Sequence, residues 1–195
     1  MSLREDILKV SRQLLVKDGF GKMSMRKIAR KADVSATSIY LHFQNKDELL
    51  LALIESSIAN LSDTLENHIS DSDDTITKIE NMANAFVEFA LENPQEYEII
   101  YMVRPEEMPR FPKEKFEQIR KIYELLAGII QEGCDKGLLK VENSLMTAYT
   151  IWAQLHGVVS VIISKRLDTR IPTGEFVHQA VDHIIQGFIT QKTPA

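Results

Sequence analysis

Apolar residues recur every three or four positions along most of the chain, which is the spacing of one face of an α-helix. No stretch shows the alternation of apolar and polar residues that marks a half-buried strand. Three prolines within 104–112 predict a loop there. The pattern therefore predicts an all-α fold of about nine helices, at 3–18, 25–32, 36–43, 46–69, 75–93, 97–103, 113–136, 143–165 and 173–191.

The segment 24–49 predicts two short helices joined by a tight turn, followed by the start of a third helix. Ser24 and Ser35 each precede a helical pattern and are suited to cap it, because a serine oxygen accepts a hydrogen bond from a first-turn N–H. Asn45 is placed to cap the third helix, and Glu48 three positions later completes a capping-box spacing. Two short helices around a tight turn indicate a helix-turn-helix unit.

Charge is distributed unevenly along the 195 residues. The chain carries a net charge of −5, but residues 1–48 hold ten Lys or Arg and six Asp or Glu, a formal charge of +4. The remainder, 49–195, then carries −9. A basic N-terminal part on an acidic body is typical of a DNA-binding domain joined to a separate module, although such a split also arises by chance. We therefore predict two domains, 1–48 and 49–195.

Several residues of this segment have side chains suited to DNA. Arg26 lies in the first turn of its helix, where a cation opposes the helix dipole and leaves the N–H groups available to a phosphate. The second helix begins with Ala36, Thr37 and Ser38, whose short side chains let the backbone approach base edges in a major groove. Tyr40 and His42 follow, with polar ends suited to phosphate oxygens.

The run from Ser24 to Leu50 resembles the DNA-binding domain of the TetR family of transcriptional regulators. The shared elements are Ile28-Ala29, Val34-Ser35, Ile39-Tyr40 and Lys46-Asp-Glu-Leu49, at the family's spacing. The resemblance implies a recognition helix over 36–43 and phosphate contacts from Ser24, Tyr40 and Lys46. Ser24 replaces the threonine of many members, and Thr37 replaces a common glycine. The predicted DNA-binding residues are Ser24, Arg26, Ser35, Ala36, Thr37, Ser38, Tyr40, His42 and Lys46.

The resemblance further implies a C-terminal helical bundle that binds a small-molecule effector and forms a homodimer through its last two helices. Trp152-Ala-Gln-Leu-His156-Gly157 is similar to a signature of one TetR subgroup. Gly157 within a predicted helix indicates close approach of another helix. The candidate effector-binding residues are Phe86, Phe89, Tyr97, Tyr101, Tyr123, Trp152 and His156. At helical spacing such side chains more often form an ordinary core than a pocket, and both interpretations stay open here.

The other chemistry of the chain argues against an enzyme. The histidines are scattered, and the sequence has no glycine-rich phosphate loop, no Gly-x-Ser-x-Gly and no metal-ligand spacing, so we expect no cofactor and no metal. The single cysteine, Cys134, fits a reducing cytoplasm and is either a buried small hydrophobe or a redox sensor. We find no signal peptide, and the run 157–163 is too short to cross a membrane.

These observations predict a cytoplasmic, homodimeric repressor that binds a palindromic DNA operator and is released by a small-molecule effector. The alternative is a DNA-binding regulator that senses no small molecule and works through a protein partner or as an activator. A cavity of roughly 300 Å³ or more in the body distinguishes them, because ligand pockets start at about that size.

Overall fold

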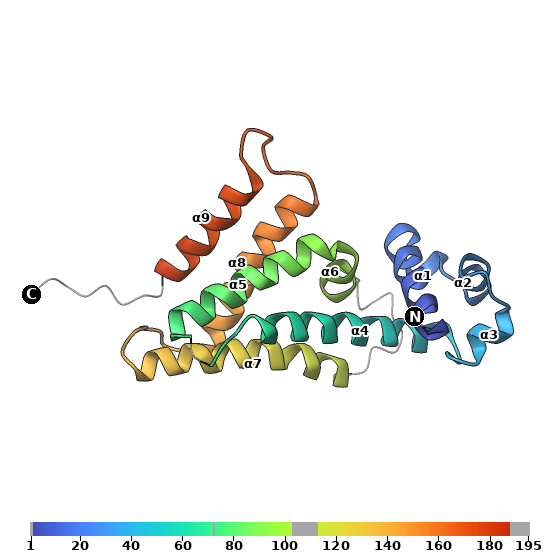
Figure 1. Cartoon of the computed structure of the whole chain (residues 1–195), viewed down its shortest axis with the longest axis horizontal. Helices are drawn as coiled ribbons and strands as arrows, with labels where there is room; N and C mark the ends of the chain where they lie inside the picture. Colours follow the sequence, from blue (N-terminus) through green and yellow to red (C-terminus); the bar gives the residue numbers. More distant parts are fainter. Residues whose placement is uncertain (1, 72, 103–112, 188–195) are drawn as a thin grey trace, which may run out of the picture. The chain divides into compact units, whose positions relative to one another are not determined.

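The computed structural model describes residues 2–71, 73–102 and 113–187, with the side chains of 113–116 left out. Every regular element in these ranges is helical, in agreement with the predicted all-α fold (Figure 1). Within the described ranges the structure has nine α-helices and one 3-10 helix: α1 (Leu3–Asp18), η1 (Phe20–Lys22), α2 (Met25–Lys31), α3 (Ala36–Tyr40), α4 (Lys46–Asn67), α5 (Thr75–Glu92), α6 (Pro94–Tyr101), α7 (Lys113–Asp135), α8 (Ser144–Ile163) and α9 (Thr173–Gln186).

The chain packs as two compact units. The first comprises Met1–Asn60 and Asn93–Phe116, and the second comprises Leu61–Glu92 and Glu117–Ala195. The division falls inside α4, which is therefore continuous between the two units. The domain boundary that we expect near residue 48 stays a prediction.

The core of the first unit is built from α1, α2, α3, the first part of α4 and α6. Apolar side chains from each of these helices are almost fully buried: Ile7, Leu14, Ile28, Ile39, Phe43, Leu49, Leu53, Tyr97 and Ile99. A polar contact also ties three of the helices together. The Arg12 guanidinium lies 2.8 Å from one carboxylate oxygen of Glu96, and the Asn60 amide donates to the other at 3.0 Å. Glu96 is itself buried, so these contacts compensate its lost hydration.

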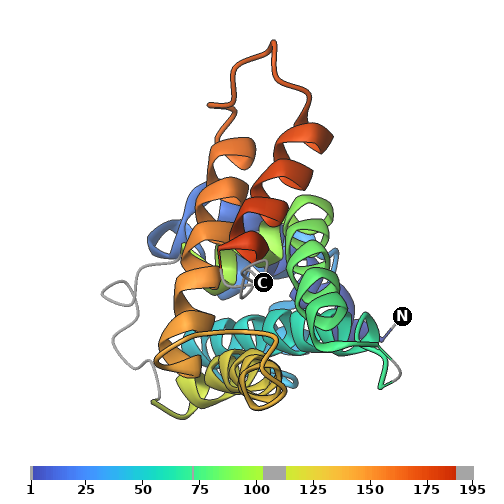
Figure 2. The same cartoon turned by 90° about the vertical axis from the view of Figure 1, so that its left-hand side faces the viewer.

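In the second unit, α5 packs against both α8 and α9, and α8 packs along α9. Figure 2 shows α8 and α9 running side by side and joined by the loop 164–172. Ala148, Ile151, Leu155 and Val159 form the buried side of α8. The other side of α8 is open in the single chain, and the apolar side chains of α9 at 176, 177 and 180 are only half-buried.

Most predicted helix ends agree with the structure to within two residues, and the differences have local causes. Pro94, which we expect to open the helix predicted over 97–103, is itself the first residue of α6, because proline fits the first helical position, where its missing N–H costs nothing. Asp74 caps α5, accepting from the N–H groups of Ile76 and Thr77 at 2.9 and 3.1 Å. The predicted loop over 104–112 lies outside the described residues. The last helix, which we predicted to reach 191, is shorter: α9 ends at Gln186, with Gly187 as its C-cap.

Candidate nucleic-acid interface

The two helices of the predicted helix-turn-helix are capped by the serines that the sequence indicates. The Ser24 hydroxyl oxygen accepts from the Lys27 N–H at 3.3 Å, and the Ser35 hydroxyl oxygen accepts from the Ser38 N–H at 3.0 Å. Between the helices the backbone turns at Asp33, whose φ of 55° lies in the left-handed region that aspartate tolerates. The caps and the turn together fix the start and the direction of α3.

The side of α3 that faces solvent is set by its buried residues. Ile39 and Phe43, four residues apart, are 0% and 2% exposed and anchor the helix to the core. Because successive residues are about 100° apart around a helix, the opposite side presents, in order around the axis, Tyr40, Thr37, Leu41, Ser38 and His42. Helical hydrogen bonding continues past Tyr40, since the Leu41 N–H donates to the Thr37 carbonyl at 3.1 Å.

The predicted base-reading residues differ in how available they are. Thr37 is exposed, whereas Ala36 and Ser38 are half-buried. The Ser38 hydroxyl lies 2.8 Å from the Ser35 hydroxyl, so these two groups share a hydrogen bond. Tyr40 is 52% exposed and His42 is also exposed, which leaves both polar ends accessible. Thr37 is thus the most accessible of the short polar side chains on this side of α3.

Lys46 has an additional structural role that the sequence does not indicate. Its Nζ donates to the Phe20 carbonyl at 2.9 Å and lies 3.8 Å from the centre of the Phe20 ring. The ammonium therefore fastens the start of α4 to η1, 26 positions earlier in the chain. An ammonium has three donors, so the remaining N–H groups stay available to a phosphate. The phosphate contact of Lys46 stays a prediction.

The charge of the first unit is partly neutralised locally. Lys27 forms an ion pair with Asp18 at 2.9 Å, and this hydrogen bond holds the pKa of the Asp18 carboxyl below its ordinary value. Arg26, by contrast, is exposed. The exposed cations of the segment 20–46 are Lys22, Arg26, Arg30 and Lys31.

Asn45 caps α4 as predicted, accepting from the Glu48 N–H at 2.8 Å. The reciprocal half of the capping box is shifted by one residue. The Glu48 carboxylate accepts from the Gln44 N–H at 2.7 Å, whereas a capping box uses the N–H of the cap residue itself. The cap still holds α4 directly after α3.

The seven candidate effector-binding residues are divided between the two units. Tyr97 and Tyr101 belong to the first, where their ring centres lie 5.2 Å apart. The other five belong to the second unit, and of these Phe86 and Phe89 are buried in α5. The candidate set therefore includes residues of both units.

Tyr123, Trp152 and His156 form part of an aromatic cluster between α7 and α8. The Trp152 ring lies edge-on to Tyr123 at 5.5 Å and is 5.2 Å from His156. Tyr149 completes the cluster at 4.4 Å from Tyr123; the sequence analysis missed it, although it lies one helical turn before Trp152. Burial lowers the pKa of His156, so its imidazole is neutral at pH 7 and can donate one hydrogen bond and accept another.

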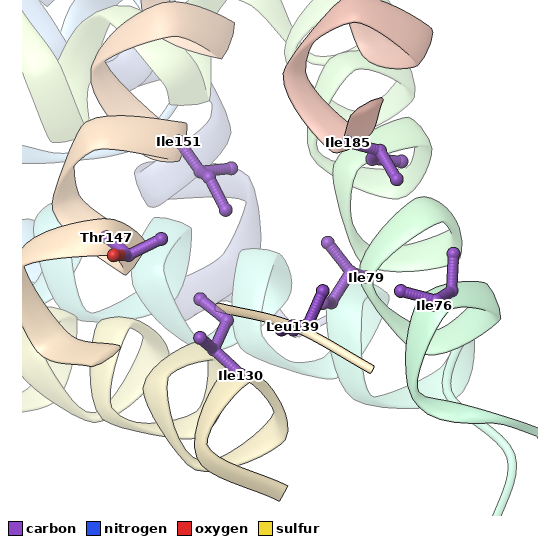
Figure 3. A pocket seen from close by; sticks show the side chains of 7 residues that line it. All are labelled: Ile76, Ile79, Ile130, Leu139, Thr147, Ile151 and Ile185. Atoms are coloured by element: carbon purple, nitrogen blue, oxygen red, sulfur yellow. The ribbon is translucent and has the colours of Figure 1, made fainter. Parts of the chain in front are cut away.

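A small cavity lies elsewhere in the second unit, and Figure 3 shows the seven side chains around it. They are Ile76, Ile79, Ile130, Leu139, Thr147, Ile151 and Ile185. Its volume is about 10 Å³, which is room for one water molecule, and its lining is almost entirely apolar. None of the candidate effector-binding residues lines it, and it is far smaller than an effector pocket.

Within the described residues, no group of His, Cys, Asp and Glu side chains is arranged to hold a metal ion. One helix, α8, is long and apolar enough to cross a membrane by length and composition alone. The run 157–163, which is too short to cross a membrane, forms only part of this helix. α8 packs against α5 and α9, and only a minor part of its apolar window is buried in the single chain.

Gly157 does not serve the purpose that we predicted within one chain. A Cβ atom added at Gly157 meets no atom of another element within 4 Å, so none of the described helices of the same chain approaches it closely. The crowded glycine is Gly133, where an added Cβ would lie 2.6 Å from Leu139 and 2.8 Å from Thr75.

Comparison with known proteins is consistent with this arrangement. The family model described as "Bacterial regulatory proteins, tetR family" matches residues 7–53, and the one described as "Tetracyclin repressor-like, C-terminal domain" matches residues 79–184, more than half of the chain. The chain therefore belongs to the TetR family. It is a DNA-binding transcriptional regulator, and proteins of this family dimerise and are in general not enzymes.

Individual relatives cover the chain to different extents. An uncharacterized HTH-type transcriptional regulator of Haemophilus influenzae is 33% identical over 92 residues, which span 47% of this chain and only 49% of that protein. A protein of unknown function from Rhodococcus sp. RHA1 shares the fold with a TM-score of 0.82 and 27% identity over 97% of both chains. A TetR family regulator from Marinobacter aquaeolei VT8 has a TM-score of 0.81 at 17% identity, over 97% of this chain and 96% of that one.

Proposed function

We propose that this regulator is a homodimeric repressor that binds a palindromic operator through α3 and is released by a small-molecule effector. The observation that carries the DNA-binding part is the outward side of α3. It presents the accessible groups of Thr37, Tyr40 and His42, and exposed cations such as Arg26 lie in the same unit. A short helix in the major groove with cations around it combines base contacts and phosphate contacts.

Two observations support a dimer through α8 and α9. The side of α8 that faces away from α5 is open in the single chain, and Gly157 on it has no neighbour within 4 Å. One recognition helix reads few base pairs, whereas two related by a twofold axis read a palindrome with half-sites a helical turn or a multiple of it apart. We propose that the helix that packs closely on Gly157 belongs to the partner subunit.

For the effector, we propose the aromatic cluster of Tyr123, Tyr149, Trp152 and His156 as a wall of the binding site. The neutral His156 imidazole supplies a hydrogen-bonding group among apolar rings, which suits an uncharged aromatic or apolar molecule. We likewise propose that Trp152, His156 and Gly157 place the chain in the subgroup with that signature. An effector releases DNA only by binding one conformation more tightly, and α4, which is shared by both units, provides a continuous connection.

The alternative that the sequence leaves open is a regulator without an effector, which works through a protein partner or as an activator. The cavity among the isoleucines of the second unit, at about 10 Å³, is well below the roughly 300 Å³ of a ligand pocket and is not itself an effector site. The two candidates share the DNA-binding step and differ only in what releases the operator.

The test is fluorescence anisotropy of the purified protein on labelled duplex from the DNA upstream of its own gene. Two salt concentrations and a scrambled competitor separate specific from non-specific binding. We expect saturation at two chains per site and survival of binding in the presence of competitor. The proposal is contradicted if the protein binds every duplex equally well and if selection from random DNA enriches no sequence. A screen of small apolar and aromatic molecules for operator release then decides between the two candidates.

Variants of α3 test the assignment of individual residues. Tyr40→Phe should weaken binding to all DNA about equally and reduce its salt dependence, because it removes a phosphate contact. Thr37→Ala and Ser38→Ala should instead relax the preference for sequence. A uniform loss of affinity in all three variants would show that the base-reading positions are assigned incorrectly.

A further inference from the structure

Among the described residues of the first unit, Leu41 is the most exposed large apolar residue. It is 80% exposed at the end of α3, and its backbone is still helical, with φ −69° and ψ −23°. It follows Thr37 by four positions and Ser38 by three, so it lies on the same side of the helix as both. The buried residues Ile39 and Phe43 lie on the opposite side. Leu41 is therefore the residue of α3 that points most directly away from the core.

Packing within the chain gives no reason for a leucine at this position. A side chain that is 80% exposed contributes little to the core, and its neighbours on this side of α3 are hydroxyl-bearing residues. Cations of the same unit, such as Arg26 and Arg30, are exposed and fit a polyanion. Leu41 is therefore placed to contact whatever binds the outward side of α3, near the C-terminal end of the helix.

The major groove of DNA displays one apolar group, the 5-methyl of thymine. Hydroxyl groups such as that of Thr37 can hydrogen-bond to the polar atoms of base edges. A leucine side chain instead makes an apolar contact, and the thymine 5-methyl group is the partner that the groove offers. We propose that Leu41 is a specificity-determining residue that contacts a thymine 5-methyl group in each half-site of the operator. This inference rests on the proposed binding of DNA through α3 and adds which base is read, and by which apolar contact.

The expected effect follows from the size of one methyl group. Burying a methyl or methylene group is worth about 0.8 kcal/mol, or roughly a fourfold change in affinity. A twofold-symmetric operator contains the contact twice, so removing both methyl groups should weaken binding about 15-fold. The salt dependence of binding should stay the same, because neither leucine nor a methyl group neutralises a phosphate.

The experiment starts from an operator selected from random duplex DNA with the full-length protein. Each thymine is replaced by deoxyuridine in symmetric pairs, which removes only the 5-methyl group. Affinities are measured by anisotropy for the wild type, for Leu41→Ala and for the control Leu138→Ala. Leu138 is 41% exposed in the turn between α7 and α8, so the control removes an exposed leucine far along the chain from α3.

One pair of thymines should stand out. Replacing it should weaken the wild type and the control about 15-fold, while Leu41→Ala should bind the original operator more weakly and lose nothing further. A thermal melt should show Leu41→Ala folded like the wild type, because its side chain is exposed. The proposal is wrong if Leu41→Ala binds the operator as tightly as the wild type, or if every replacement affects both proteins equally. Failure of the wild type to select any sequence would instead overturn the proposed function as well.

Discussion

Gly157→Ala should stabilise the isolated chain and weaken the dimer, because the surface at Gly157 is open in the single chain. Gly157 and Gly128 both lie inside long helices, are exposed, and have no atom within 4 Å of an added Cβ. Replacing glycine by alanine inside a helix stabilises it by about 1 kcal/mol. For a chain of this length, that raises the melting temperature by about 2–4 °C. Both variants should show this gain in the isolated chain.

Dimer formation should distinguish the two substitutions. If a helix of the partner packs closely on Gly157, the added methyl group overpacks the contact, which costs about 1–3 kcal/mol. The twofold axis applies the cost at two sites, or about 2–6 kcal/mol per dimer. Gly157→Ala should therefore raise the dimer Kd by roughly 30-fold or more. Gly128→Ala should leave the Kd unchanged.

Sedimentation equilibrium measures the dimer Kd, and thermal melting over a range of protein concentrations measures stability. Gly133→Ala is a third, crowded case: its Cβ would meet Leu139 and Thr75 at under 3 Å, so it should destabilise the fold itself. If Gly157→Ala gains stability and keeps the Kd exactly as Gly128→Ala does, no partner helix approaches Gly157 and our assignment of the interface is refuted.

Three further predictions concern single contacts. Lys46→Ala should lower the free energy of unfolding by about 1–2 kcal/mol in urea titrations, because it removes a hydrogen bond and a cation–π contact. The control Tyr40→Phe should change that free energy by less than about 0.5 kcal/mol. If the two variants are equally stable, Lys46 does not have this structural role. Because burial lowers the pKa of His156 below 6.5, the unfolded chain binds a proton first as the pH falls, so stability should be complete above about pH 6.5 and decrease below it; His156→Gln should flatten this slope, and an unchanged slope would assign it to other groups. Arg12→Met should destabilise the fold by about 3 kcal/mol by leaving a buried Glu96 without its cation, and adding Glu96→Met should recover part of that loss; strictly additive losses would show that the pair is not coupled.

The residues of the candidate interface could be predicted in part because their signals are local. Ser24, Ser35 and Asn45 each cap the helix that follows by accepting a hydrogen bond from the N–H three residues later, and such caps are visible in sequence. Leu41 could also have been found, since four positions separate it from Thr37 and its outward direction follows from the buried positions of α3. The aromatic set was less predictable, because helical spacing does not distinguish a pocket wall from a core.

The sequence by itself determined the helices, their caps and the basic N-terminal part, because helical periodicity and capping depend on residues within one or two turns. Only the tertiary structure decided which long-range pairs form. Lys46 donates a hydrogen bond to the Phe20 carbonyl, and Arg12 forms an ion pair with Glu96, which is distant in the sequence. It also showed that, among the described residues, no other helix of the same chain packs closely on Gly157. Such contacts depend on how whole helices pack, and many different packings satisfy the same local pattern of apolar residues.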